Sequence, residues 1–141
     1  MNELIKLTDN LFKVKNDLDG ALKEILENKE SAYEQSWTPQ ALTCENEDEF
    51  RIYLSLPFSA KENINVSLKE NILTIEGESA FKNEKKMEIL RNEINYGRFF
   101  RAFRINQPVK NSAIKASYKD GVLEIILPKS EEAKPNKINI E

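Results

Sequence analysis

The sequence contains no histidine and only one cysteine, and each of these shortages excludes a class of catalytic or metal-binding site. Without histidine the chain can form no Ser-His or Cys-His catalytic pair and no histidine-ligated metal site. Cys44 alone can form neither an internal disulfide nor a multi-thiolate metal site. Because it lies in a predicted strand, we expect a small, half-buried thiol there. The sequence therefore predicts no metal and no cofactor.

Long apolar runs are also missing. Bilayer-spanning helices need roughly 20 apolar residues, and the longest runs here are a few residues. The N-terminus lacks the charged-then-apolar plan of a signal peptide. The net charge of −3 gives no general reason to expect nucleic acid or an acidic membrane as a partner. We therefore expect a cytoplasmic protein with no membrane span.

The chain nevertheless has enough apolar residues to build a core. Leu, Ile, Val and Phe account for 39 of its 141 residues. This share lies above the roughly 20% that marks disordered compositions. A chain of this length favours one domain with residues left over for terminal segments.

The first 30 residues are predicted to be helical. Their apolar positions recur at heptad spacing and form a wide stripe, although Gly20 weakens the pattern in its middle. The stripe comprises Leu4, Leu7, Leu11, Phe12, Leu18, Leu22 and Ile25. Such a stripe has to be buried, and three locations stay open: the body of the same chain, a neighbouring subunit, or another protein.

After Trp37 the hydrophobic period changes from helical to alternating. Alternation and turn residues predict strands at 50–56, 64–68, 72–75, 98–105, 114–118 and 122–127. Pro57, Gly77, the Asp120-Gly121 pair and Pro128 separate or end them. Several short strands without internal helices predict an all-β fold, an antiparallel β-sandwich of about 90 residues.

The segment 79–97 is too long for an ordinary hairpin connection. Its first part, 82–86, is a charged and solvated run. Its second part, 87–94, has the composition of a short strand, and a strand on a long loop can pair with a distant sheet edge, including that of another subunit. The alternative is a mobile, exposed loop.

Several segments together resemble the α-crystallin domain of bacterial- or archaeal-type small heat shock proteins. They are 37–39 (WTP), 96–104 (YGRFFRAFR), 116–123 (ASYKDGVL), 127–129 (LPK) and 138–140 (INI). The resemblance covers about residues 37–141, and the N-terminal arm matches only in character. Phe58 stands where the family usually has glycine, which disfavours a positive-φ turn there. Asn106 stands where the family usually has proline.

The resemblance implies an immunoglobulin-like β-sandwich, the α-crystallin domain, at 37–129. A helical N-terminal arm at 1–36 precedes it and an extended C-terminal tail at 130–141 follows. It also implies an ATP-independent holdase, which is not an enzyme and which binds unfolding client proteins. Such proteins form homodimers that assemble into larger oligomers, so the arm becomes the candidate client-binding segment.

Ile138 and Ile140 are the candidate oligomer anchor. In an extended chain they point to the same side, roughly 7 Å apart, and this spacing suits a sheet-edge groove with two apolar pockets. In the family, that groove lies between the strands that match 64–68 and 114–118. The resemblance therefore implies Val66, Leu68, Ile114 and Ala116 as its lining. The alternative is a frayed terminus without a partner.

Met87, Ile89 and Leu90 are the candidates for a strand exchanged between subunits, because bacterial members of the family dimerise in this way. Arg101 shares a strand face with Phe99 and Phe103, so its charge needs a partner, for which we expect a carboxylate. The family has an arginine at the matching position, with a structural role in the domain and the dimer.

Three other functions are conceivable from the sequence. The bases and aromatics of 98–104 invite nucleic-acid binding, but the strand alternation places Arg101 on an apolar face. Clustered carboxylates, at 45–49 and 131–132, are conceivable in a hydrolase but lie in solvated turns. A co-chaperone of the p23-like type, docking on one defined partner, is the main alternative, although that type lacks both the apolar arm and the Ile-x-Ile tail.

Overall fold

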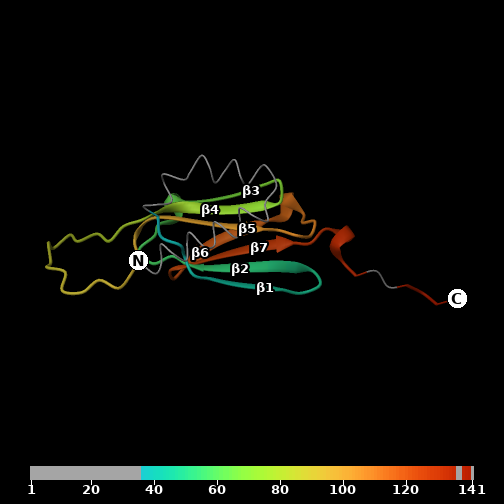
Figure 1. Ribbon diagram of the computed structural model, residues 1–141, viewed down its shortest axis with the longest axis horizontal. Coiled ribbons are helices and arrows are strands. Elements are labelled where there is room, and N and C mark those ends of the chain that lie inside the picture. Colours follow the sequence, from blue (N-terminus) through green and yellow to red (C-terminus); the bar gives the residue numbers. More distant parts are fainter. Residues whose placement is uncertain (1–35, 136–137, 141) are drawn as a thin grey trace.

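The protein is an antiparallel β-sandwich of two stacked sheets (Figure 1). The computed structural model describes residues 36–135 and 138–140. The strands are β1 (Ala41–Glu45), β2 (Glu49–Ser55), β3 (Ile64–Lys69), β4 (Ile72–Ser79), β5 (Gly97–Arg104), β6 (Lys115–Lys119) and β7 (Val122–Pro128). Short 3-10 turns occupy Lys61–Asn63, Asn111–Ala113 and Glu131–Ala133. The sheet orders are β1-β2-β7-β6 and β3-β4-β5, so the predicted all-β architecture is confirmed.

The core forms where the alternating apolar residues of both sheets meet. In β2 and the residue after it, Ile52, Leu54 and Leu56 are at most 3% exposed, and the polar residues between them face outward. The same alternation fills the core from the other sheet. The buried cluster comprises Ile52, Leu54, Leu56, Leu73, Ile75, Phe99, Ile105, Leu123, Ile125 and Leu127.

The fourth strand is longer than predicted. The sequence pattern ends it at Gly77, but β4 continues to Ser79 and pairs with β5 along its whole length. Gly77 is needed for close approach rather than for a turn. A Cβ atom at this position would overlap the carbonyl oxygen of Asn63 and lie 2.7 Å from Cζ of Phe99. The absence of a side chain at Gly77 therefore allows the 3-10 turn at Lys61–Asn63 to pack directly against β4.

Two local expectations are wrong. Cys44 is exposed, because it pairs with Arg51 on the outward face of the sheet and because β1 is an edge strand among the described strands. Phe58 adopts φ 56° despite its side chain. Its ring packs on that of Phe81, with 5.5 Å between the ring centroids, and this contact offsets part of the cost of the left-handed backbone.

Two segments project from opposite ends of the sandwich (Figure 1). The long loop between β4 and β5 extends beyond the body at one end. The C-terminal tail after β7 extends at the other. The fold thus separates the candidate dimer segment from the candidate oligomer anchor.

Candidate functional site

The edge strands β3 and β6, between which the sequence analysis expects the anchor groove, are the first part of the candidate site. Arg101 Nη1 on β5 donates a hydrogen bond to the Pro39 carbonyl just before β1, at 3.0 Å. This bond places β5 on the β1 side of the sandwich. The other two edge strands, β3 and β6, therefore flank the opposite side. Tyr118 Oη on β6 donates to the Leu56 carbonyl at 2.6 Å and holds β6 against the chain that leads into β3.

The predicted groove residues lie on the inward faces of these two edges. Val66 and Leu68 on β3 are half-buried and alternate with exposed polar residues. Ile114 is half-buried just before β6, whereas Ala116 is exposed within it. Val66, Leu68 and Ile114 also pack against the core cluster. Because each edge strand has a sheet neighbour on one side only, these inward apolar atoms stay partly accessible and can accept a further apolar segment.

The candidate anchor residues are accessible to solvent in the single subunit. Ile138 is 86% exposed and Ile140 is 99% exposed. Fully burying an isoleucine is worth about 1.5–3 kcal/mol. Two such side chains on a projecting tail are therefore an unused source of binding free energy.

The root of the tail is held firmly against the body. Lys129 is only 6% exposed, and its Nζ lies 2.8 Å from Oε2 of Glu45 at the end of β1. The same ammonium lies 4.7 Å from the centroid of the Phe50 ring. The backbone N–H of Lys129 donates to the Asp48 carbonyl at 2.8 Å. The β1–β2 hairpin thereby fixes where the tail begins.

A second set of polar contacts continues this attachment to Lys134. The Lys134 ammonium lies 3.1 Å from the Glu131 carboxylate and 3.9 Å from that of Asp48. Lys110 lies 3.5 Å from Glu131 on the other side. Lys134 and Lys110 together lower the pKa of the Glu131 carboxyl below its usual value. These ion pairs are exposed, so they orient the tail more than they stabilise the fold.

The long loop presents the predicted dimer residues to solvent. Met87, Ile89 and Leu90 are 66%, 51% and 90% exposed. The short strand expected at 87–94 is not formed in the single chain, where this stretch is irregular. The Asn83 side chain closes a turn by accepting from the N–H and donating to the carbonyl of Met87, both at 2.8 Å. Strand formation here needs a sheet edge with which to pair.

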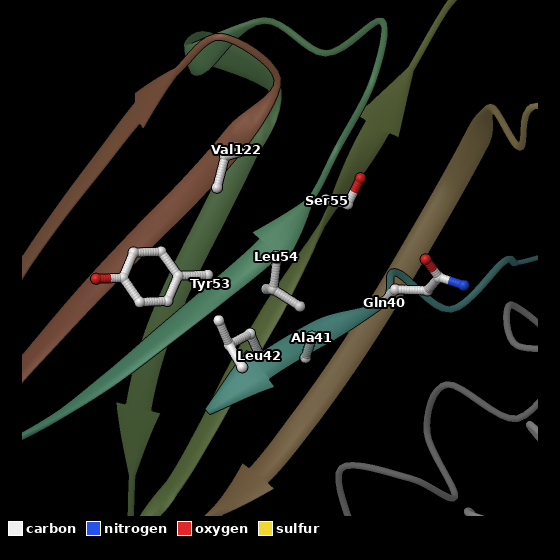
Figure 2. Close-up of a pocket in the computed structure, with 7 residues that line it drawn as sticks. All are labelled: Gln40, Ala41, Leu42, Tyr53, Leu54, Ser55 and Val122. Atoms are coloured by element: carbon white, nitrogen blue, oxygen red, sulfur yellow. The ribbon is translucent and has the colours of Figure 1, made fainter. Parts of the chain in front are cut away.

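Such an edge is available on β1, next to an apolar pocket that the sequence analysis did not identify. Figure 2 shows the residues that line this pocket. Its volume is about 290 Å³, and Leu42, Tyr53 and Val122 place it on the outward side of the four-stranded sheet. Its lining comprises Gln40, Ala41, Leu42, Tyr53, Leu54, Ser55 and Val122. Leu42 and Val122 are 64% and 41% exposed. Leu42 in an outward register was the available signal, because an apolar residue there has no role in the core.

Arg101 lies on the core-facing side of β5, as the alternation predicts. Its guanidinium stacks 5.0 Å from the centroid of the Phe103 ring and donates to the Pro39 carbonyl. Its hydrogen bond among the described residues thus goes to a carbonyl rather than to the expected carboxylate. Burial lowers the pKa of Arg101 below its usual value. The contacts support a structural role that ties β5 to the chain before β1.

The predicted client-binding residues lie outside the part of the chain that the structure describes. They are Leu4, Leu7, Leu11, Phe12, Leu18, Leu22 and Ile25. Within residues 36–135 and 138–140, no three potential metal ligands cluster. The helices in this part of the chain are too short and too polar to cross a membrane.

The comparison with protein families agrees with this architecture. The family model described as "Hsp20/alpha crystallin family" matches residues 43–141. The chain belongs to this family. The resemblance identified from the sequence is therefore confirmed, and the sandwich is its α-crystallin domain.

Curated relatives of this small heat shock protein include two of different origin. Small heat shock protein C4 of Rickettsia felis is 36% identical over 104 residues, covering 73% of this chain and 64% of that protein. A heat shock protein of Dictyostelium discoideum is 30% identical over 134 residues, covering 92% of this chain and 32% of that protein. The chain thus spans less than two thirds of the length of these relatives.

Solved structures of small heat shock proteins share the fold. A protein from Xylella fastidiosa, described as having a distinct high order structure, matches with a TM-score of 0.62 and 31% identity. The match covers 75% of this chain and 98% of that one. The hspA protein of Xanthomonas axonopodis matches with a TM-score of 0.60 and 32% identity, covering 67% of this chain and 95% of that one.

Proposed function

We propose that this chain is an ATP-independent holdase chaperone, which binds partly unfolded proteins and prevents their aggregation. It works from dimers assembled into larger oligomers, in the cytoplasm. The observation that carries the proposal is that a single subunit leaves three sets of apolar side chains accessible. These are the tail isoleucines, the apolar residues of the long loop and of the β1 edge, and the half-buried inward side chains of β3.

The tail and the groove are complementary in chemistry and shape. Ile138 and Ile140 lie two residues apart, so an extended tail aims both side chains at one surface. The inward side chains of β3 repeat at the same spacing, with Val66 and Leu68 half-buried. A tail from one dimer laid along the groove of another therefore buries apolar surface on both sides. Groove residues Ile114 and Ala116 complete the lining from the other sheet.

The tail contact is weak enough to be reversible. Two buried isoleucines contribute about 3–6 kcal/mol before losses, and ordering the backbone costs about 1–2 kcal/mol per residue. One contact therefore opens readily, whereas many contacts within one assembly hold it together through effective concentration. Heating favours release, because a freed tail gains conformational entropy.

The dimer is built from the long loop and the β1 edge. The segment around Met87, Ile89 and Leu90 leaves its own body and adds to β1 of the partner as a further strand. Strand pairing supplies hydrogen-bond partners for the backbone N–H and C=O groups of the loop. The pocket beside Leu42 then receives apolar side chains of the incoming strand. A positioning role for Arg101 follows, because it holds β5 to the chain that enters β1.

Client binding is assigned to the N-terminal arm. Its apolar stripe is wide and non-directional, and such a surface suits unfolded segments of many sequences. A catalytic function is not proposed, because the family consists of small heat shock chaperones rather than enzymes.

Light scattering of a heat-labile protein, with and without this chain and with no nucleotide added, tests the proposal. We expect suppression of aggregation at near-stoichiometric amounts. The chain with Leu11→Ser and Leu18→Ser loses suppression, whereas a matched variant with Asn10→Ser and Asn16→Ser keeps it. No suppression by the unmodified chain, together with a monomeric mass, contradicts the holdase and supports the p23-like binding module.

A further inference from the structure

The three-stranded sheet has a second buried surface, on the side that faces away from the core. Strand alternation directs Leu73, Ile75 and Phe99 into the core cluster. Their neighbours Ile72, Thr74 and Phe100 therefore point to the opposite side of the sheet, which we call the outer face. Ile72, Thr74 and Phe100 are nevertheless only 2%, 7% and 5% exposed.

Such burial is not a general property of outward positions in this sandwich. On the four-stranded sheet, the outward residue Leu42 is 64% exposed, and Tyr53 is half-buried. Phe100 and Ile72 do not belong to the core cluster. A phenylalanine ring on the outer surface of a sheet becomes this inaccessible only when other atoms cover it. The outer face therefore behaves as one side of an interface.

The residues that connect the N-terminal arm to the body lie next to this face. The N–H of Trp37 donates to the Arg98 carbonyl at 2.9 Å, and the N–H of Phe100 donates to the Trp37 carbonyl at 3.3 Å. Trp37 also forms a parallel bridge with Phe99. Trp37 therefore pairs with β5 on the side away from β4, and the chain enters the described part of the structure one strand away from the outer-face residues on β4. Among the described residues, no other segment as long as the arm joins the body at this side of β5.

The arm has dimensions that fit the outer face. As a helix, the 22 residues from Leu4 to Ile25 are about 33 Å long. The strands β4 and β5 have 8 residues each, or about 26 Å. The linking residues 26–35 reach up to about 33 Å when extended. One amphipathic helix can therefore lie along the sheet with its apolar stripe facing inward.

Charge also favours this partner. Residues 1–35 contain eight acidic residues and five lysines, so the arm is net negative. Around its apolar centre the outer face has exposed basic side chains from Lys69 on β3 and from Arg98 and Arg104 on β5, and carboxylates from Glu76 and Glu78 on β4. Three basic and two acidic residues leave this face with a small positive excess. Exposed charges of opposite sign add little affinity but favour this orientation over others.

We propose that the outer face, centred on Ile72, Thr74 and Phe100, is the docking surface for the apolar stripe of the N-terminal arm of the same chain. Docking covers the stripe and withholds it from other proteins. This regulatory consequence rests on the proposed chaperone function, because it requires the arm to be the client-binding segment. The docking itself does not depend on that function and is tested without a client.

Photo-cross-linking on the full chain tests the docking. Benzoylphenylalanine replaces Phe100 in one variant and Tyr53, an aromatic residue on the outward side of the other sheet, in a matched control. Equal amounts of ¹⁴N- and ¹⁵N-labelled chains are mixed before assembly, so that mass spectrometry distinguishes products within one chain from products between chains. We expect the Phe100 variant to cross-link to residues 1–35 of the same chain and the Tyr53 variant not to do so. Products confined to residues 36–141, products between chains only, or no product overturn the proposal.

Hydrogen exchange provides a second, independent readout. Phe100→Ser raises the exchange of arm amides at least about tenfold, which corresponds to the loss of one buried aromatic contact. Tyr53→Ser leaves arm exchange unchanged, and unchanged protection of β7 amides shows that each variant is folded. Arm exchange that is the same in both variants overturns the docking. If docking holds but Phe100→Ser does not increase client binding, the assignment of the arm to clients fails instead.

Discussion

Removing the two tail isoleucines separates the role of the tail in assembly from its role in the subunit. In the single chain Ile138 and Ile140 are 86% and 99% exposed, so Ile138→Ala with Ile140→Ala leaves the folding stability of the subunit almost unchanged. In the proposed assembly, each Ile→Ala substitution removes three carbon atoms that would be buried in the groove. At about 0.8 kcal/mol per buried carbon, the double variant loses about 5 kcal/mol per contact. This loss weakens each contact by roughly three powers of ten.

Light scattering coupled to size exclusion measures the mass of the assembly, and a thermal melt measures the subunit. We expect the double variant to elute near the mass of a dimer with an unchanged melting temperature. Asn139→Ala is the matched control, since this side chain lies between the isoleucines and points away from the groove; its assembly keeps the full mass. An unchanged mass for the double variant refutes the anchor role. A lowered melting temperature refutes the expectation that the tail isoleucines do not contribute to the folding stability of the subunit.

Three further predictions concern the sheet, the loop and the tail root. Gly77→Ala places a Cβ against a backbone carbonyl and is expected to destabilise the fold by about 1–3 kcal/mol, as measured by denaturant unfolding; wild-type stability contradicts the close approach. Deleting 82–94 yields monomers in native mass spectrometry, and a stable dimer disproves the strand exchange. The pKa of Glu131 is lowered by Lys134 first and Lys110 second, so its stabilising contribution is present above the ordinary carboxyl pKa of about 4.3 and is lost as the pH falls through the lowered value. An NMR titration of Glu131 measures this pKa, and we expect Lys134→Met to raise it; no change excludes the lysine as its main cause.

The strands and the core were predictable because alternation alone determines which residues face inward. Ile52, Leu54 and Leu56 are buried as their spacing requires. Arg101 lies on the same face of β5 as Phe99, as the alternation of side chains along a strand predicts. These outcomes need only local geometry and a requirement to bury apolar surface, and both can be read from one sequence.

The errors arose where the outcome depends on non-local contacts. Gly77 was interpreted as a strand end, although the constraint comes from a turn that packs on it from elsewhere in the chain. Phe58 adopts positive φ, and Phe81 offsets part of the cost through a ring contact that the local sequence does not reveal. Cys44 is exposed because β1 is an edge strand, and edge positions follow from topology rather than from alternation. The apolar pocket beside Leu42 was missed although the outward register of this apolar residue was an available signal.

The proposals on the dimer and on the tail meet at β1. The exposed edge of this strand is the proposed acceptor for the partner's loop, and its last residue, Glu45, holds Lys129 at the tail root. The root is fixed as far as Lys134, so the six residues that follow it reach at most about 20 Å to Ile140. A tail with so short a reach and a fixed origin can enter only those grooves that the dimer brings near it. On these two proposals, pairing at the β1 edge determines which dimers the tails can join, so the assembly can have a defined arrangement although each tail contact is weak.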